Sequence, residues 1–230
     1  MKVLGIIPAR AGSKRLKNKN LLELVDKPLI NWTIEAALGS NILSKVIVST
    51  DCPQIMSVAK HAGADVPFLR PAELSTDKSS SVEAVSHALD FFHRNKNLQF
   101  DYIILLQPTS PFRDKNHLKK AFEIMLESKS KSCVSVTLSD CNPNWMFWLN
   151  FKGKSMSPIL DKFKSLRSQD GRAAYSLNGA IYICKTEQFK KHRKFIFEST
   201  TPFIMEKDAS IDIDTIEDFN RAREIARNRS

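Results

Sequence analysis

The sequence predicts an α/β fold, a doubly wound, mostly parallel (Rossmann-like) sheet with helices on both faces. Two observations support this fold class. Short, nearly continuous apolar runs recur along the chain, as expected for parallel strands that are buried on both faces. Amphipathic helical patterns lie between these runs, and right-handed crossovers then cover both faces of the sheet. The chain has 230 residues, so we expect one domain over 1–230 with an arm inserted at about 139–177.

Each predicted element has a recognisable pattern. The apolar runs are KVLGII (2–7), KVIVST (45–50), DYIILLQ (101–107), SCVSVT (132–137) and AIYIC (180–184). Helical periodicity covers 29–38, 53–62, 80–94, 115–127 and 215–227. In the third helix, Ser80 and Glu83 have the spacing of a capping box.

The alternation stops between about 139 and 177, where CNPNWMFWLNFKGK predicts a hairpin. This hairpin is rich in large apolar side chains: Trp145, Phe147, Trp148, Leu149 and Phe151. They could belong to a core strand. We favour an arm that packs on a second subunit, because an apolar patch of that size is rarely left exposed. The protein is therefore expected to be a homodimer.

Composition narrows the possible partners. The formal net charge is +10 and the pI is near 9.5, which favours polyanions such as nucleic acid, anionic lipid or a phosphorylated small molecule. No apolar run approaches the ~18 residues of a membrane span. The first apolar run is short and contains Pro8, so no signal peptide is expected. Four scattered cysteines without a C-x-x-C pair predict reduced thiols and a cytoplasmic location.

A cluster of cations follows the first strand, in GIIPARAGSKRLKNKN (5–20). Like charges repel, so this crowding indicates a bound anion. Ligands of open α/β sheets bind beyond the carboxyl ends of the strands, where this segment lies. Neither a Walker A loop nor G-x-G-x-x-G fits it. The small residues would still let backbone N–H groups approach phosphates: Ala9, Ala11, Gly12 and Ser13. A solvated basic loop is the alternative.

Two aspartates stand near the C-terminus in SIDIDT. If this segment is a strand, Asp212 and Asp214 share one face. Neighbouring carboxylates repel unless a cation lies between them, and Mg²⁺ bound to substrate phosphates would suit that position. Alternatively, Asp214 caps the following helix, with Glu217 completing a capping box.

The cation-rich segment IPARAGSKRLKNKNL resembles the signature of the CMP-acylneuraminate synthetase family, cytidylyltransferases that activate acidic nine-carbon sugars. Three further segments match in order: LRPAELSTDKSSS (69–81), LLQPTSPFR (105–113) and NGAIYI…SIDIDTIEDF (178–219). The sister family that loads CMP onto the eight-carbon sugar Kdo shares I-P-A-R, but usually lacks the G-S-K-R…K-N continuation and the S-I-D-I-D-T ending. The resemblance implies a single nucleotidyltransferase domain.

The implied reaction joins CTP to a 2-keto sugar acid and releases pyrophosphate, with Mg²⁺ as cofactor. The sugar's anomeric hydroxyl attacks the α-phosphorus. By resemblance, three residues are catalytic: Arg10, Lys19 and Asp212. Mg²⁺ would be held by Asp212 and Asp214. The nucleotide would contact Ala9, Arg10, Ala11, Gly12, Ser13, Lys14, Lys19, Asn20, Arg70 and Ser81. Arg15 is a plausible helper, whereas Lys17 is interpreted as a rim charge.

The sugar would contact Gln107, Thr109, Ser110, Arg167 and Asn178. Simpler roles compete with several assignments. Arg70 could pair with Glu73, Ser81 could act only at the helix start, and the Gln107 and Asn178 segments could be plain turns. Arg113 could be a surface charge or assist with the sugar.

The sequence departs from many relatives at two places. Gly171-Arg172 stands where they have Leu-Pro, and a lysine that some sialic-acid enzymes carry is replaced within 144–146. Arg167 or Arg172 could pair with the sugar carboxylate instead. These departures argue against N-acetylneuraminic acid itself and favour legionaminic or pseudaminic acid.

Two rival functions remain at this stage, a Kdo cytidylyltransferase and a basic nucleic-acid-binding module. The second needs cations spread over a face with aromatic platforms. Here the densest cations lie in one turn, so we expect CTP and an acidic nine-carbon sugar as partners, with neither nucleic acid nor membrane. This interpretation requires the turn after the first strand and the two aspartates to meet around one phosphate chain.

Overall fold

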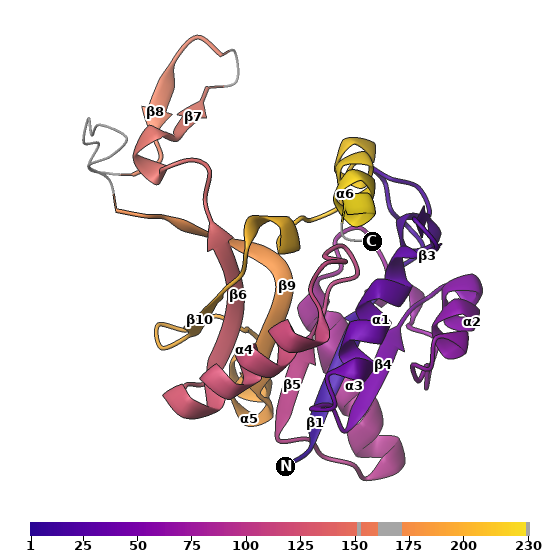
Figure 1. Cartoon of the computed structure of the whole chain (residues 1–230). Helices are drawn as coiled ribbons and strands as arrows, with labels where there is room; N and C mark the ends of the chain where they lie inside the picture. Colours follow the sequence, from indigo (N-terminus) through magenta and orange to yellow (C-terminus); the bar gives the residue numbers. More distant parts are fainter. Residues whose placement is uncertain (151–152, 161–171, 229–230) are drawn as a thin grey trace.

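The computed structural model describes residues 1–150, 153–160 and 172–228. Its main sheet has six strands in the order β10-β6-β9-β5-β1-β4 (Figure 1). All of the predicted strands are present, and β10 is an additional one. The strands are β1 (Val3–Pro8), β4 (Lys45–Ser49), β5 (Tyr102–Leu105), β6 (Ser132–Leu138), β9 (Tyr175–Lys185) and β10 (Thr201–Ile204).

One strand runs against the others. β9 pairs antiparallel with both β5 and β6, whereas the pairs β1–β4, β1–β5 and β6–β10 are parallel. The prediction of a parallel strand at 180–184 was therefore wrong, although the sheet is mostly parallel as expected. Residues such as Ile181 and Ile183 are fully buried. An apolar run of this kind reports burial on both faces and carries no information about strand direction.

Helices cover both faces of the sheet, which confirms the doubly wound architecture. Ile34, Ile55 and Phe122 of α1, α2 and α4 pack in one apolar cluster, and Leu89 and Phe189 of α3 and α5 pack in a second. The predicted helices are present, and α5 is additional. Their bounds are α1 (Leu29–Gly39), α2 (Pro53–His61), α3 (Ser81–Lys96), α4 (Lys115–Ser128), α5 (Thr186–His192) and α6 (Ile216–Asn228).

Local signals account for several helix ends. The capping box predicted for Ser80 and Glu83 forms at the start of α3. Asp114 and His117 make the equivalent pair at the start of α4. Short 3₁₀ helices connect other elements: η1 (Lys19–Leu21), η2 (Ala72–Leu74), η3 (Pro143–Trp145) and η5 (Lys207–Ala209).

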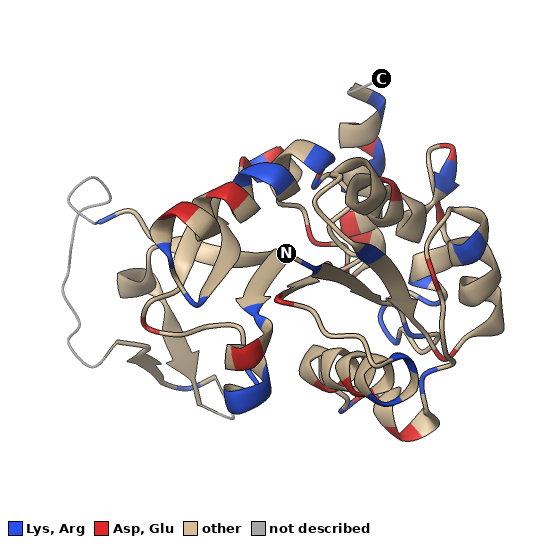
Figure 2. Cartoon of the chain, turned by 90° about the horizontal axis from the view of Figure 1, so that it is seen from below, with Lys and Arg blue, Asp and Glu red and all other residues tan. Residues whose placement is uncertain are grey.

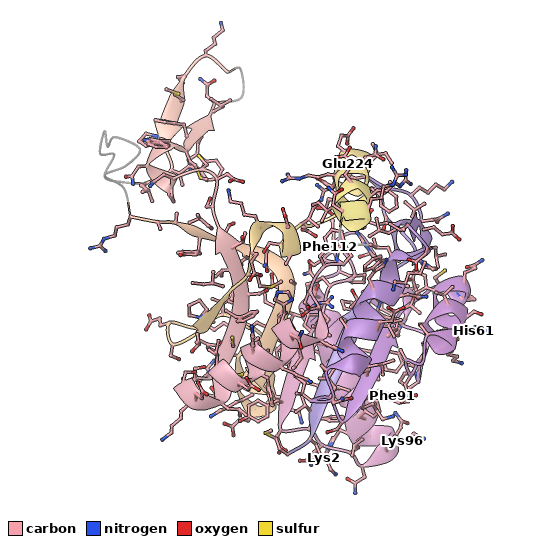
Figure 3. The ribbon with its side chains drawn as sticks, viewed as in Figure 1. Lys2, His61, Phe91, Lys96, Phe112 and Glu224 are labelled. Carbon is pink, nitrogen blue, oxygen red and sulfur yellow. The ribbon has the colours of Figure 1, made fainter. Side chains whose placement is uncertain are left out.

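A third apolar cluster lies at the carboxyl edge of the sheet and joins segments that are distant in sequence. It contains Leu16 from the basic segment, Phe112 from the segment after β5, and Ile213 and Phe219 near the C-terminus. Phe112, labelled in Figure 3, meets Trp32 edge-on with ring centroids 5.9 Å apart. Leu24 also belongs to this cluster. It comes from a small antiparallel pair of strands, β2 (Glu23–Leu24) and β3 (Lys27–Pro28). The cluster brings the first loop and the C-terminal segment together.

The predicted hairpin is present as β7 (Phe147–Leu149) and β8 (Met156–Pro158), paired antiparallel in a sheet of their own. Figure 1 shows it projecting from the body of the molecule. Its apolar side chains are largely exposed, with Trp148 at 64%, Leu149 at 71% and Met156 at 63%. Phe151 lies outside the described residues.

None of the described helices combines the length and apolar character that crossing a lipid bilayer requires. The four cysteines are free, in agreement with the prediction of reduced thiols. Figure 2 shows basic and acidic residues interspersed over the helices seen from below.

Candidate active site

A cavity of about 480 Å³ opens beyond the carboxyl ends of β1 and β5. It lies where open α/β sheets bind their ligands. Most of the residues predicted to bind nucleotide line it: Arg10, Ser13, Lys14, Lys19, Asn20, Arg70 and Ser81. Gln107 and Thr109, predicted to contact the sugar, and Asp214, predicted to hold metal, line the same cavity.

The first loop and the C-terminal aspartates meet, as the sequence interpretation required. Lys19 Nζ lies 2.9 Å from Asp214 Oδ1 and donates a second hydrogen bond of 2.7 Å to the carbonyl of Ile213. Arg15 Nη2 lies 2.7 Å from Asp214 Oδ2. The Lys19 side chain is only 11% exposed, so its charge is placed by the fold.

The alternative role for Asp214 as a helix cap is wrong. Asp218 accepts hydrogen bonds from the backbone N–H groups of Asp214 and Thr215, and Thr215 Oγ1 accepts from the N–H of Asp218. Thr215 and Asp218 therefore cap α6, which leaves the Asp214 carboxylate to face Arg15 and Lys19.

The SIDIDT segment is not a regular strand, although the shared face of Asp212 and Asp214 was inferred for one. A single backbone hydrogen bond of 2.8 Å, from Ile213 N to the carbonyl of Thr109, attaches it to the segment after β5. Ile213 is nevertheless fully buried, whereas Asp212 is exposed and Asp214 is half-buried. Burial of Ile213 thus turns the two aspartate side chains away from the core, as in a strand, although the segment belongs to no sheet.

The Asp212 carboxyl lies beside the cavity but is not among its lining residues. Although its surface is exposed, surrounding protein desolvates the carboxylate and raises its pKa, and the negative charge of Asp214 acts in the same direction. The Thr109 hydroxyl and Lys19 oppose part of this shift. A carboxylate made less stable by a like charge is a suitable ligand for a divalent cation.

In the first loop, three of the four backbone N–H groups predicted to approach phosphates are hydrogen-bonded within the protein. Ala9 is buried and donates its N–H to the carbonyl of Ser49, and Ala11 donates its N–H to the Asp51 carboxylate. Ser13 N–H bonds the carbonyl of Ala11, and Gly12 is exposed with room for a β-carbon. These contacts occupy the N–H groups of Ala9, Ala11 and Ser13, whereas the side chains of Arg10, Lys14 and Lys19 line the cavity.

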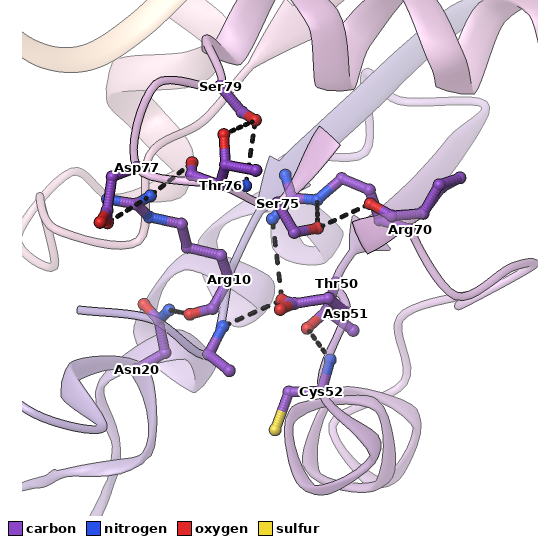
Figure 4. A network of polar contacts seen from close by, with 12 residues as sticks. Arg10, Asn20, Thr50, Asp51, Cys52, Arg70, Ser75, Thr76, Asp77 and Ser79 are labelled. Carbon is purple, nitrogen blue, oxygen red and sulfur yellow. Dashed lines mark hydrogen bonds and ion pairs between the residues drawn. The ribbon is translucent and has the colours of Figure 1, made fainter. Parts of the chain in front are cut away.

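Arg70 also lines the cavity, and Figure 4 shows it in one polar network with Ser75 and Asp51. It is only 7% exposed, its Nε donates to Ser75 Oγ at 3.1 Å, and its Nη2 lies 4.0 Å from Asp51. The predicted alternative, a pair with Glu73, is therefore wrong. Burial lowers the pKa of Arg70, while Asp51 raises it. Asn20 is buried and donates to the carbonyl of Arg10 at 3.2 Å.

Sequence reasoning missed Asp51, which contacts both the first loop and Arg70. Its position contains the signal: it directly follows the strand predicted at 45–50, which neighbours β1 in the sheet. An acidic residue at the carboxyl end of the adjacent strand is well placed to neutralise cations that gather there.

Two of the predicted sugar contacts lie beneath the cavity. Ser110 is fully buried and donates to the carbonyl of Asn178, whose own amide bonds Ser135 Oγ at 2.6 Å and Ser210 Oγ at 2.9 Å. At Gly179, φ is +74°, and a β-carbon there would lie 3.1 Å from Gln107 Oε1. Ser110 and Asn178 therefore support the turn against which Gln107 rests. Arg167 lies outside the described residues.

Arg113 is not the surface charge that the sequence allowed. It is fully buried and donates to the carbonyls of Ala180 and Gln107 at 3.1 and 3.2 Å and to Thr33 Oγ1 at 2.8 Å. These bonds fix the segment after β5 against β9 and α1. Arg113 therefore positions Gln107 from below.

The chain matches the family model described as Cytidylyltransferase over residues 4–229. It is 39% identical over 221 residues to the N-acylneuraminate cytidylyltransferase of Escherichia coli, covering 96% of this chain and 51% of that protein. The chain thus spans about half the length of that relative.

Two other relatives are similar over nearly their whole length. The CMP-N,N'-diacetyllegionaminic acid synthase of Legionella pneumophila is 41% identical over 216 residues, covering 94% of this chain and 92% of that protein. The pseudaminic acid cytidylyltransferase of Campylobacter jejuni is 35% identical over 224 residues, covering 97% and 95%.

Among solved structures, CMP:2-keto-3-deoxy-manno-octonic acid synthetase complexed with CTP superposes with a TM-score of 0.74 over 100% of both chains. Its sequence identity is 18%, so this similarity concerns the fold alone.

Proposed function

This chain belongs to the cytidylyltransferase family, and from that premise we propose that it transfers CMP from CTP to the anomeric hydroxyl of a nonulosonic acid. The observation that carries the proposal is the convergence of Arg10, Lys14, Lys19 and Arg70 on one cavity at the carboxyl edge of the sheet. Such a cavity suits a ligand with several negative charges. The relatives named for sialic, legionaminic and pseudaminic acid transfer support the substrate class.

In the proposed reaction, the anomeric oxygen forms a bond to the α-phosphorus of CTP while the bond to the departing pyrophosphate breaks. Arg10 and Lys19 would balance the negative charge that grows on pyrophosphate. The hydroxyl proton must leave the sugar, and Asp212 is our candidate acceptor, because its carboxylate lies next to the Asp214 and Lys19 charges at the cavity. Arg70, Asn20 and Ser81 would contact the cytosine and ribose.

We also propose that Asp212 and Asp214 hold Mg²⁺. Their carboxylate oxygens are of the type that Mg²⁺ prefers. Asp214 already contacts Arg15 and Lys19, but each carboxylate oxygen has a second lone pair for a metal. When bound, Mg²⁺ would neutralise phosphate charge and acidify the sugar hydroxyl. Removing metal by chelation should abolish turnover, and adding Mg²⁺ should restore it.

The sugar we propose is a di-N-acyl acid, legionaminic or pseudaminic, in preference to N-acetylneuraminic acid or Kdo. The reason is the sequence departure at Arg172 and within 144–146. The chain's similarity to the legionaminic acid synthase over nearly its whole length supports this choice.

A panel of sugars tests the activity and the substrate together. The protein is mixed with CTP, Mg²⁺ and one of four acids, N-acetylneuraminic, legionaminic, pseudaminic or Kdo, and pyrophosphate release is measured. We expect release with a di-N-acyl acid. Release with Kdo alone would overturn the assignment of the sugar. If the folded protein released no pyrophosphate with any of the four acids, the proposed CMP transfer would be overturned.

We further propose that the protein is a homodimer held by the arm. The exposed apolar side chains of β7 and β8 support this, because such a patch is seldom left in contact with water. Light scattering should give the mass of a dimer, and Trp148→Lys should give that of a monomer. Lys154→Ala, an exposed change in the same arm, serves as control. A monomeric wild type would overturn the proposal.

We place the protein in the cytoplasm. The free state of all four cysteines supports this location, because an oxidising compartment favours disulfides.

A further inference from the structure

The turn between η2 and α3 carries a carboxylate to the edge of the cavity. Ser79 N–H bonds the carbonyl of Thr76 at 3.1 Å, and Ser79 Oγ accepts from the N–H of Thr76 at 3.0 Å. Ser79 Oγ also donates to the carbonyl of Glu73 at 3.2 Å. These bonds hold the turn in shape, and Asp77 lies at its tip among the residues that line the cavity.

Asp77 contacts two of the cations that we assign to phosphate. Its carboxylate lies 2.6 Å from Lys14 Nζ and 3.2 Å from Arg10 Nη1, as Figure 4 shows for Arg10. Arg10 Nη1 also donates to the carbonyl of Thr76 at 2.7 Å, so the guanidinium is held by the turn as well as by its tip. The hydrogen bond from Lys14 lowers the pKa of Asp77, which keeps the carboxylate charged near neutral pH.

These contacts are of a kind that a phosphate can displace. The side chains of Arg10, Asp77 and Lys14 are 33%, 44% and 76% exposed. Exposed ion pairs contribute little because water screens them. A pyrophosphate group offers several charges and several acceptor oxygens to the same two cations, whereas Asp77 offers one charge. By contrast, the pair between Lys19 and Asp214 includes a side chain that is only 11% exposed.

We infer that Asp77 is an internal competitor of pyrophosphate: it occupies Arg10 and Lys14 whenever no phosphate is bound. A ligand gains these cations only by displacing the carboxylate, so Asp77 weakens the binding of pyrophosphate. After CMP transfer, Asp77 returns to the cations and helps the product leave. Its part in product release rests on the proposed function, whereas the competition for the two cations does not.

Titration calorimetry with inorganic pyrophosphate in metal-free buffer tests this inference directly. Three full-length proteins are compared: the wild type, Asp77→Asn and Glu73→Gln. Glu73 is a matched control, because it is an exposed acid near the same turn and makes no ion pair within the described residues. Asp77→Asn should bind pyrophosphate about threefold to tenfold more tightly than the wild type, as the loss of two exposed pairs implies. Glu73→Gln should bind it as the wild type does.

Unchanged or weaker binding by Asp77→Asn would overturn the inference, because the aspartate would then position the cations instead of competing for them. An equal gain in pyrophosphate affinity in both variants would also overturn it, since the loss of any nearby negative charge would then be enough to tighten binding. So would the absence of pyrophosphate binding in both the wild type and Asp77→Asn. The readout needs no turnover. A protein that shows the Asp77 effect without transferring CMP would refute only the proposed function.

Discussion

The cavity and the arm expose opposite kinds of side chain, and the difference lies in what supports them. The cavity displays cations, yet an apolar cluster containing Leu16, Phe112 and Ile213 lies behind them. The arm displays Trp148 and Leu149 on a two-stranded hairpin that stands apart from the main sheet. Isolated hairpins are marginally stable in water. A small charged ligand needs pre-positioned groups, whereas an exposed apolar hairpin needs a partner to cover it.

The largest expected effect comes from removing one cation of the cavity. Arg10→Ala should lower kcat/KM for CTP by about 10²–10³, the usual cost of one well-placed donor at a site of developing charge. Lys17→Ala is the control, because Lys17 belongs to the same basic segment but is exposed and absent from the cavity lining. Steady-state pyrophosphate release and thermal melting should be measured on both variants. An equal loss of activity in both variants would show that net charge matters more than the position of the cation.

Next in size is the support behind the cavity. Ile213→Ala should lower the free energy of unfolding by about 2–5 kcal/mol, because it opens a hole in the cluster that joins the first loop to the C-terminal segment. Leu149→Ala in the exposed arm should change it by no more than about 0.5 kcal/mol in the monomer. Urea unfolding at low protein concentration measures both. Similar losses would mean that the arm is part of the core.

A smaller effect is expected at the start of α6. Asp218→Asn should cost about 1 kcal/mol of stability at neutral pH, the usual value of a helix cap. Burial raises the pKa of Asp218, but hydrogen bonds from Asp214 N–H and from Thr215 outweigh it and lower the pKa overall. The native carboxylate therefore stabilises the fold above the ordinary aspartate pKa.

This contribution should disappear as the pH falls through the lowered pKa of Asp218. Denaturant midpoints of Asp218→Asn and the wild type should therefore differ at neutral pH and converge in acid. A difference that persists at the lowest pH would rule out the cap as its source.

The smallest effect is expected at Gly12. A β-carbon would contact nothing within 4 Å, and φ at Gly12 is not in the positive region. Gly12→Ala should change stability by no more than about 0.5 kcal/mol and retain turnover. A large loss of turnover with stability preserved would show that the loop backbone approaches phosphate, as the sequence pattern first suggested.

The sequence was informative where a local pattern has one physical cause. Buried strands need apolar runs, so those at 2–7 and 101–107 could be predicted. Ser80 and Glu83 act over a single turn of helix, so their capping box was predictable too. The motif match identified most of the residues that line the cavity, because such motifs record positions along the chain without requiring knowledge of the fold.

Contacts between distant segments were less predictable. Asp51 accepts a hydrogen bond from the N–H of Ala11, 40 residues away, and Asp77 pairs with Arg10 from the first loop. Neither contact follows from a local pattern, although Asp51 directly follows a predicted strand. Ser110 and Asn178 have polar side chains typical of a site, but the structure places them under it. Whether a polar group faces ligand or protein depends on what packs behind it.

By itself, the sequence determined the class of fold, the order of most elements and the segments that carry the chemistry, because periodicity and capping act over a few residues. Only the tertiary structure decided the direction of β9, the partners of Asp214 and the occupation of the loop N–H groups. The meeting of Lys19 with Asp214 arises where burial of Leu16 and Ile213 in one cluster draws the first loop and the C-terminal segment together. Long-range packing, which no local pattern encodes, selects which charges finally meet.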